Sequence, residues 1–489
     1  MKTNSLDFDA QALREKILDL AMRGKLVPQD PNDEPASVLL EKIKAEKAEL
    51  IKEKKIKKTK PLPPLTDDEK PFDIPDSWEW VRLGDVAEII MGQAPKGNTV
   101  NSECDGIEFH QGKTEFTEDI IGKSDKFTTS LNKVIDSDYI VMAVRAPVGD
   151  VNLVNRKIAI GRGLSGIKGY VSDKNYIFYY LGSMKEYYNQ RSTGSTFKAI
   201  NGNVIKNTPI ALPPLSEQSR IAAKIAQLFA LLRKVETSTQ QYAKLQTLLK
   251  SKVLDLAMRG KLVKQDPNDE PASVLLEKIK AEKQELIKEK KIKKTKPLPP
   301  ITDDEKPFAI PGSWEWVRLG DLVAPVEYAM ADGPFGSNLK KADYTDQPEV
   351  RIVQLSNIGE NGWKDDNVKY TTFEHLKLIQ RSEVFPGNIV IAKMMPAGRA
   401  ILIPNKDKKY VLSSDAVKFI PNDLLNKQFL LDAINSNAYR NQVNQKLQGT
   451  TRPRTSLKKL KNFILPTPPL EEQERITREI SKLLALALM

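Results

Sequence analysis

The chain has 489 residues, which is enough for two to four domains with sizeable hydrophobic cores. Its composition, 40% hydrophobic and 29% charged, is typical of a soluble globular protein. It has no run of about 18 apolar residues that could span a membrane, and its first residues lack the basic-then-apolar pattern of a secretion signal. A single cysteine, Cys104, excludes internal disulfides, so we expect a cytoplasmic protein.

The formal net charge of +12 favours a polyanionic partner. This charge is spread along the chain. Residues 41–60 and 277–296 each carry a net charge of +5, residues 86–212 carry +2, and residues 322–467 carry +7. The spread suits a protein that lies along DNA better than one that touches it at a single point.

Two internal repeats organise the chain. Residues 18–85 recur at 254–321 with an offset of 236, and only five of these 68 positions differ. PPLSEQSRI at 213–221 returns as PPLEEQERI at 468–476 with an offset of 255, which also aligns the Gly-Ser-Thr that begins at Gly194 with Gly-Thr-Thr.

The two offsets together place Met1 opposite position 237 and Met489 opposite position 234. Only Val235 and Glu236 therefore lack a counterpart. The sequence predicts a pseudo-two-fold internal repeat with circularly continuous termini that lie close together in space.

In chain order, the first expected elements are a helical piece near 7–23 and an amphipathic helix near 36–58. The Pro-rich segment at 60–72 should end the second helix and lead in extended form into the next domain. The repeat predicts the same helix near 272–294, followed by the same linker.

Between the repeated segments lie two unlike stretches, about 78–212 and 314–467. Both are rich in β-branched and aromatic residues with turn signals, and both end in a short helical stretch. These features predict two α+β globular domains.

Residues 216–259 predict one long helix, because apolar residues keep mostly three- and four-residue spacing up to Gly260, a C-terminal stop. At 1.5 Å per residue this helix would be roughly 65 Å long. Its symmetry mate must be assembled from 471–489 and 7–23. A two-fold axis makes the pair antiparallel and similar to a coiled coil.

The predicted fold class is therefore α+β, with two globular domains separated by long antiparallel helices. The expected divisions are N-terminal scaffold helices and linker at 1–77, a first globular domain at 78–215, central helices and linker at 216–313, a second globular domain at 314–470, and a C-terminal scaffold helix at 471–489.

A family resemblance rests on WEWVRLGD, which begins each globular domain (78–85 and 314–321), and on PPLxEQxRI, which follows each one (213–221 and 468–476). With the alternating order of scaffold and variable domain, the chain resembles HsdS, the specificity subunit of type I restriction–modification systems, over essentially its whole length. The resemblance implies that each variable domain is a target recognition domain that reads one half of a bipartite, asymmetric DNA sequence.

The resemblance also implies partners and cofactors. Two methyltransferase subunits, which bind S-adenosylmethionine, would dock on the conserved helices, and restriction subunits, which use ATP and Mg²⁺, would join through them. The chain itself would bind double-stranded DNA but no cofactor and no membrane, and would be a non-catalytic subunit.

Motifs of a self-sufficient enzyme are missing from the sequence. It contains no phosphate-binding G-x-x-x-x-G-K-[ST] or G-x-G-x-x-G and no Asn/Asp-Pro-Pro-aromatic motif of amino-methyltransferases. With His110, His375 and Cys104 as its only His and Cys residues, we predict no catalytic site and no metal site. The acidic run 67–69 reads as solvated charge. Four tryptophans read as packing anchors where the globular domains begin: Trp78, Trp80, Trp314 and Trp316.

DNA contacts are expected at polar-basic turns, because Lys and Arg meet phosphates while Arg, Lys, Asn and Gln read base edges. The candidates in the first domain are Gln93, Lys96, Asn98, Gln111, Lys113, Arg191, Ser195, Thr196, Lys198 and Asn201. Those in the second domain are Ser337, Lys340, Lys341, Gln354, Asn357, Thr450, Thr451, Arg452, Arg454 and Lys458.

Two other classes of function stay open. A self-contained DNA methyltransferase or nuclease would turn over DNA without partners. A coiled-coil adaptor would bind proteins only, and salt-dependent DNA binding would distinguish it from a DNA-reading subunit.

Overall fold

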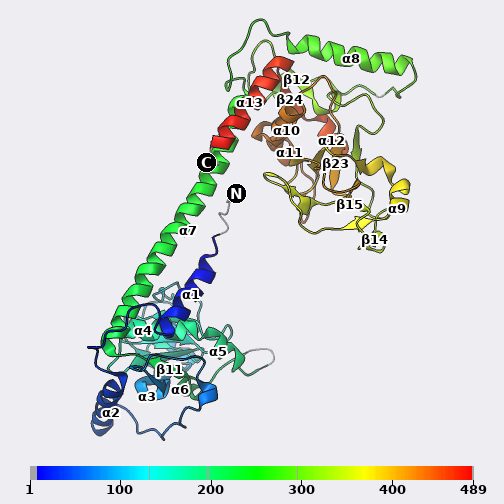
Figure 1. The fold of residues 1–489 in the computed structure, drawn as a ribbon. Coiled ribbons are helices and arrows are strands. Elements are labelled where there is room, and N and C mark those ends of the chain that lie inside the picture. Colours follow the sequence, from blue (N-terminus) through cyan, green and yellow to red (C-terminus); the bar gives the residue numbers. More distant parts are fainter. Residues whose placement is uncertain (1–7, 132, 195–197, 295, 487–489) are drawn as a thin grey trace. The chain divides into compact units, whose positions relative to one another are not determined.

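The computed structural model describes residues 8–131, 133–194, 198–294 and 296–486. The chain divides into two compact units, 1–240 and 241–489, and the division falls inside one long helix, α7 (Leu215–Met258). In each unit a globular body of strands and short helices is joined to scaffold helices (Figure 1). The predicted α+β class and the predicted long helix are both confirmed.

The scaffold helices of the first unit are α1 (Ala10–Met22), α2 (Ala36–Lys52) and the first half of α7. The strands of its globular body are β1 (Glu79–Arg82), β2 (Ala87–Met91), β3 (Val100–Asn101), β4 (Ile107–His110), β5 (Phe127–Thr128), β6 (Val134–Ile135), β7 (Ile140–Ala143), β8 (Val151–Leu153), β9 (Ile158–Ile160), β10 (Leu164–Gly169) and β11 (Pro209–Leu212). The helices of this body are α3 (Leu83–Val86), α4 (Lys174–Ser183), α5 (Lys185–Gln190) and α6 (Gly202–Lys206).

The second unit contains the scaffold helices α8 (Ala272–Lys288) and α13 (Leu470–Leu486). Its strands are β12 (Glu315–Arg318), β13 (Met330–Asp332), β14 (Tyr344–Thr345), β15 (Val350–Val353), β16 (Ile358–Gly359), β17 (Gly362–Trp363), β18 (Tyr370–Thr371), β19 (Glu383–Val384), β20 (Ile389–Ala392), β21 (Ala400–Leu402), β22 (Tyr410–Leu412), β23 (Ala416–Phe419) and β24 (Ile464–Thr467). Its other helices are α9 (Phe373–Leu378), α10 (Lys427–Asn435), α11 (Asn437–Gln445) and α12 (Leu457–Asn462).

The two globular bodies share the strand order of their two main sheets despite their unlike sequences, and the second has an additional ribbon, β16-β17. The first has an antiparallel sheet β2-β10-β7-β8 and a five-stranded sheet β3-β5-β4-β9-β6, in which β4 and β9 run parallel. The second repeats this plan as β13-β23-β20-β21 and β14-β18-β15-β22-β19, with β15 and β22 parallel. We call the two bodies the first reader and the second reader.

The four-stranded sheet of each reader is buried on both faces, which explains its continuous apolar strands. In β7, Ile140 and Met142 pack in a core with α4, while Val141 and Ala143 pack with the five-stranded sheet. The alternating residues of β20 divide in the same way between two cores. Each reader is therefore a layered body of helices, a central sheet and an outer sheet.

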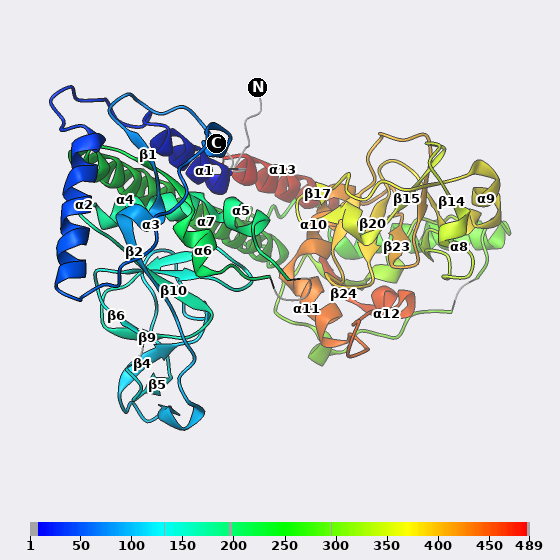
Figure 2. The ribbon, with the colours of Figure 1, turned by 90° about the horizontal axis from the view of Figure 1, so that it is seen from below.

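Helix α1 lies antiparallel to the first half of α7. Arg14 binds Glu236 at 2.6 Å, whereas Gln29, beyond the end of α1, binds Glu217 at 2.5 Å. Later residues of the N-terminal segment therefore meet earlier residues of α7, as in an antiparallel pair. Figure 2 shows the two helices side by side.

Helix α13 packs on the last turns of α7, where Ile476 and Ile480 share a core with Ala257 and Met258. The two predicted pieces of the mate helix are thus helical, each beside its half of α7. The predicted meeting of the chain ends falls on residues 1–7 and 487–489, outside the described residues, and stays a prediction.

Helices α1 and α7 end as the sequence predicts, with Gly24 and Gly260 in the left-handed region at φ 66° and 63°. Helix α2 ends at Lys52, six residues earlier than expected. Lys54 takes the left-handed conformation there (φ 59°), and the N–H of Lys55 bonds to the carbonyl of Leu50, a Schellman closure without glycine. Because Lys is an unusual residue at this position, the pattern gave no stop signal.

Each reader leaves and rejoins the scaffold at one place. Strand β1, at its start, pairs antiparallel with β11, at its end, from Glu79 opposite Leu212 to Arg82 opposite Pro209. Strands β12 and β24 form the same two-stranded ribbon in the second unit. The sequence of the globular body between the two strands of such a ribbon can change without moving the point where the body joins the scaffold.

A buried arginine holds the Pro-rich linker against this ribbon. Arg82 is 5% exposed, forms a bidentate pair with Glu69 (2.7 Å for both bonds), and donates to the carbonyls of Pro63 and Pro64. The hydrogen bond from Arg82 lowers the pKa of Glu69 to about 2. Of the acidic run predicted to be solvated, Asp67 is 96% exposed, whereas Glu69 has this specific partner.

A buried carboxylate at the start of α7 joins three segments. Glu217 is fully buried and accepts hydrogen bonds from Trp78 Nε1 (2.9 Å) and Gln29 Nε2 (2.5 Å). Burial raises the pKa of this carboxyl. Trp314 and Glu472 form the same contact in the second unit at 2.8 Å, so these two tryptophans are packing anchors as expected.

Replacing Arg82 by Gln should release the first linker, because it removes the hydrogen bonds from Arg82 to Glu69, Pro63 and Pro64, each worth about 1 kcal/mol. A lysine-specific protease should then cut within 53–72 faster than in the wild type, while the rate of cleavage in the linker at 289–308, held by Arg318, stays unchanged and serves as the internal control. Since the pKa of Glu69 is lowered from 4.5 to about 2, this stabilisation is complete above pH 4.5 and is lost as the pH falls toward 2. Equal cleavage of both linkers would contradict this role.

Trp78→Phe should destabilise the first unit by about 1–3 kcal/mol, because it leaves a buried carboxylate with one donor fewer. Glu217→Gln in the same chain should recover most of the loss, since a neutral amide is cheaper to bury. Hydrogen exchange at the first turn of α7 measures both effects, with the first turn of α13 as the unchanged reference. No recovery in the double variant would show that the tryptophan acts by packing alone.

Candidate nucleic-acid interface

The candidates of the first reader belong to three polar-basic turns, 92–98, 110–113 and 191–201, whose described residues come together along one edge. Four backbone hydrogen bonds fasten them through two further turns: Gln93 N to Ile160 O (3.1 Å), Gly161 N to His110 O (2.7 Å), Val144 N to Gly163 O (2.9 Å) and Ala146 N to Lys198 O (2.9 Å). We call this edge the first rim, formed by residues 92–98, 110–113, 144–147, 161–163, 191–194 and 198–201.

Close backbone approach in the first rim requires glycine. A Cβ on Gly161 would lie 2.4 Å from the side-chain oxygen of Gln111, and one on Gly163 would lie 2.5 Å from its carbonyl oxygen. These contacts place the 110–113 turn directly against the 161–163 turn, which sequence analysis did not select.

The candidates of the first rim have different environments. Five of them are exposed: Gln93, Lys96, Asn98, Gln111 and Lys198. The two lysines among them form no ion pair within the described part of the chain. The guanidinium of Arg191, also exposed, lies 3.7 Å from the ring centroid of Tyr187. Asn201 caps α6, accepting from the backbone N–H groups of the second and third residues after it. Ser195 and Thr196 lie outside the described residues.

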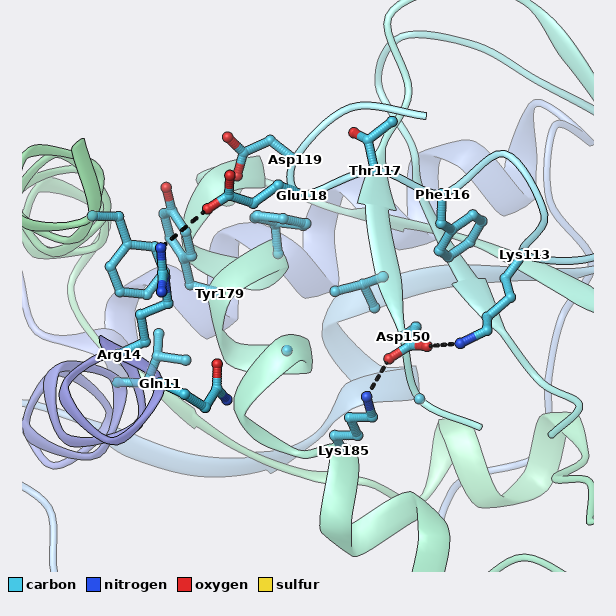
Figure 3. Close-up of a pocket in the computed structure, with 16 residues that line it drawn as sticks. Gln11, Arg14, Lys113, Phe116, Thr117, Glu118, Asp119, Asp150, Tyr179 and Lys185 are labelled. Carbon is cyan, nitrogen blue, oxygen red and sulfur yellow. Dashed lines mark hydrogen bonds and ion pairs between the residues drawn. The ribbon is translucent and has the colours of Figure 1, made fainter. Parts of the chain in front are cut away.

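Lys113 points away from the rim into a cavity of about 750 Å³ between the first reader and its scaffold helices. Figure 3 shows Lys113 and Lys185 converging on Asp150, at 2.7 and 2.6 Å. Burial opposes ionisation of Asp150, but the two ammonium groups hold the pKa of its carboxyl below the ordinary value. Lys113 is therefore ion-paired within the protein, where it shares the carboxylate of Asp150 with Lys185.

Two arginines of the first rim, Arg145 and Arg162, were not predicted from the sequence. Both are exposed, and neither has an ion pair among the described residues. The available signal was local: Arg162 stands between two glycines, and Arg145 follows an apolar strand and precedes Ala-Pro. With Lys96, Arg191 and Lys198, the first rim presents five exposed cations.

The second reader forms an equivalent edge. Four backbone hydrogen bonds join its turns: Gly333 N to Ala416 O (3.0 Å), Ser413 N to Val353 O (2.9 Å), Lys393 N to Asp415 O (2.8 Å) and Thr455 N to Lys393 O (2.8 Å). We call this edge the second rim, formed by residues 333–341, 354–357, 393–398, 413–415 and 448–459.

The offset of 255 found in the sequence is present in the backbone of the two rims. Thr193 and Arg145 each bridge to Ala199, and Gln448 and Met394 each bridge to Arg454. Positions 193 and 199 thus correspond to 448 and 454. The glycines that follow 193 and 448 both have positive φ, 110° and 97°.

Most candidates of the second rim are exposed: Ser337, Lys340, Lys341, Thr450, Thr451, Arg452, Arg454 and Lys458. The other two hold the rim together. Gln354 exchanges hydrogen bonds with Asn367, and Asn357 is fully buried, with its amide donating to the carbonyls of Lys364 and Asp366. Gln354 also lines a rim pocket of about 350 Å³.

The two rims differ in apolar character. Gly92 and Gly333 occupy the same place, since each donates to the first residue of the neighbouring strand, β10 or β23. Two residues further on, the first rim has Ala94 and the second has Phe335, whose side chain is 77% exposed. Similarly, Met395 of the second rim is 59% exposed and corresponds to Ala146 of the first rim, since the preceding residues, Met394 and Arg145, form equivalent bridges. Neither residue was predicted from the sequence.

His110 is fully buried, with its ring nitrogens 2.9 Å from Glu108 and 3.3 Å from Glu115. Burial works against ionisation of Glu108, but a bidentate pair with Arg156 lowers the pKa of its carboxyl to about 2. This network fastens the outer sheet.

Within the described ranges, no three His, Cys, Asp or Glu side chains group to hold a metal ion. The same ranges contain no helix long and apolar enough to cross a membrane.

The comparisons with known proteins agree on one family. A family model described as the type I restriction modification DNA specificity domain matches residues 75–246 and 311–489. The chain is 34% identical to the EcoAI specificity subunit of Escherichia coli, covering 98% of this chain and 89% of that protein. It is 33% identical to the EcoEI specificity subunit of the same organism, covering 84% and 78%.

A solved structure from work on complex assembly and conformational transition of the type I R-M system has the same fold. It aligns with a TM-score of 0.55 at 20% identity, covering 85% of this chain and 92% of that one. The repeated scaffold, the matched pair of readers and these relatives lead to the same conclusion. The chain belongs to the family of type I restriction–modification specificity subunits, with two target recognition domains.

Proposed function

We propose that this chain is the non-catalytic DNA-reading subunit of a type I restriction–modification complex, and that its readers, 78–215 and 314–470, each recognise one half of a bipartite, asymmetric target. The observation that carries the proposal is that two rims with the same backbone plan present different side chains. A symmetric scaffold with unlike rims suits a target whose two halves differ in sequence.

The exposed cations of the rims are the proposed DNA contacts. Flexible ammonium groups such as those of Lys96 and Lys340 suit phosphates, whereas the planar guanidinium of Arg145, Arg162 or Arg454 suits the O6 and N7 acceptors of guanine. Amide side chains such as Gln93 and Gln111 suit adenine. Lys113, Asn201 and Asn357 would then support the rim from behind, since each already bonds within the protein.

The proposed partners follow from the family. Two methyltransferase subunits carrying S-adenosylmethionine would dock on the scaffold helices, and restriction subunits using ATP and Mg²⁺ would join that core. Both chemical activities would belong to the partners, and the chain described here would supply the choice of target.

Footprinting of the chain assembled with its methyltransferase partner should show two short sets of protected bases separated by unspecified base pairs. The target can first be identified by mapping methylated sites in genomic DNA with and without this gene. The chain alone, given DNA, S-adenosylmethionine, Mg²⁺ and ATP, should show no turnover. One continuous protected sequence, or turnover by the isolated chain, would contradict the proposal.

Arginine substitutions should separate the two half-sites. Arg145→Ala or Arg162→Ala should weaken discrimination in one half-site only, and Arg454→Ala in the other only, each by about 1–3 kcal/mol or roughly 5- to 150-fold. Lys96→Ala should instead lower affinity for all sequences and reduce the slope of log K against log salt by about 0.9. Lys58→Ala, an exposed linker lysine, is the control. Equal effects on both half-sites would refute the assignment of one reader to each.

A further inference from the structure

A network of charged side chains joins the first reader to helices α1 and α7. Arg14 of α1 lies 3.6 Å from Glu118, and Arg233 of α7 lies 3.1 Å from both Glu118 and Asp119. Arg14 is also held in a bidentate pair by Glu236 of α7, at 2.9 and 2.6 Å. Figure 3 shows Arg14 reaching Glu118 across the edge of the cavity.

The acidic pair is presented rigidly by the reader. Hydrogen bonds join the loop that carries the pair to strand β8. Leu153 N donates to the carbonyl of Asp119 (2.8 Å), and the buried side-chain amide of Asn152 exchanges hydrogen bonds with the backbone of Thr117 (2.8 and 2.9 Å). Strand β8 pairs with β7 in a hairpin whose turn carries Arg145 of the first rim. A displacement of the acidic pair would therefore be transmitted to the rim.

The same scaffold position holds the second reader. The offset of 236 takes Arg14 to Lys250, and Lys250 Nζ donates to the carbonyl of Glu360 (3.0 Å) and to Asn361 Oδ1 (3.2 Å). These two residues form the turn between β16 and β17 of the second reader. Two readers of unlike sequence are thus held from one equivalent position, by different chemistry.

The asymmetry between the two contacts has a source in the sequence. Glu236, which holds Arg14, is one of the two positions without a counterpart in the repeat. The first contact is a network of full charges whose side chains are 18–53% exposed, whereas the second uses a backbone carbonyl and an amide. Partly exposed charge networks weaken with salt, and hydrogen bonds to neutral groups weaken much less.

We propose that Arg14 and Lys250 are positioning residues that fix the orientation of each reader on its own scaffold helices, and so restrict the spacing between half-sites that the subunit accepts. This inference rests on the proposed function. In it, the scaffold helices set the approximate spacing, and these two contacts remove the remaining freedom of each reader.

The test uses the assembled methyltransferase complex and DNA targets whose spacer is one base pair shorter than, equal to, or longer than the native spacer. Wild-type complex should prefer the native spacing. Glu118→Gln with Asp119→Asn should reduce that preference about fivefold, the equivalent of about 1 kcal/mol, with unchanged affinity for an oligonucleotide carrying one half-site. Lys16→Ala is the control, because Lys16 is exposed on α1 and pairs only with Asp19 of the same helix among the ion pairs of the described residues. It should leave the spacing preference unchanged.

Salt and charge reversal distinguish positioning from a general structural role. Raising the salt concentration should relax the spacing preference of wild type and of Lys250→Ala, but not that of the Glu118/Asp119 variant. Arg233→Lys should retain more of the preference than Arg233→Glu, which sets a like charge against Glu118 and Asp119. Arg14→Lys should retain more of it than Arg14→Ala, which covers the case in which the alanine variant misfolds.

An unchanged spacing preference in the Glu118/Asp119 variant would overturn the inference. So would an equal loss of binding on all three spacers, since that would place the acidic pair in folding or in DNA contact. Failure of the wild-type complex to recognise any bipartite target would instead refute the proposed function, so the two outcomes are distinguishable.

Discussion

The architecture depends on a carboxylate buried at the first turn of a scaffold helix. Glu217 sits where the reader ends, and its two donors come from the segment after α1 and from the tryptophan that begins the reader. Three segments distant in sequence therefore meet around one acid. Because an unsatisfied buried carboxylate is costly, neither donor can leave without a loss of stability. Glu472 does the same in the second unit, so the attachment of both readers follows one design.

This attachment separates the residues that determine folding from those available for recognition. Paired strands at the start and end of each reader close the domain on itself, and Arg82 or Arg318 fastens the linker behind that ribbon. The rims are held largely by backbone hydrogen bonds, which do not depend on side-chain identity except where glycine is needed. Exposed side chains on the rims can therefore change at little cost to stability, and this explains how one strand topology carries two dissimilar sequences.

The repeated scaffold was predictable from sequence because its signals are periodic and duplicated. Helical periodicity predicted the long helix, Gly260 predicted its end, and the two offsets predicted its antiparallel partners. The early end of α2 was not predictable, because Lys54 adopts a conformation that usually needs glycine. The turns of the rims were predicted separately, but their contact was not, since it depends on long-range backbone pairing. The same limit applies to single side chains: Lys113 and Asn357 look like surface polar residues in sequence, and only tertiary partners show that one is ion-paired and the other buried.

Positions 14 and 250 lie just before the nearly identical segments of the repeat, where the two copies differ in sequence. The nearly identical segment begins at residue 18, just after Arg14, and its copy begins just after Lys250. Before that boundary the scaffold touches loops that belong to one reader alone, Glu118–Asp119 in one case and Glu360–Asn361 in the other. A residue that must fit an acidic pair cannot also be the best fit for a carbonyl and an amide. Sequence identity between the repeats should therefore be lost first at scaffold positions that contact a reader-specific loop. By this argument, the divergence of Arg14 from Lys250 reflects adjustment of the scaffold to two different readers.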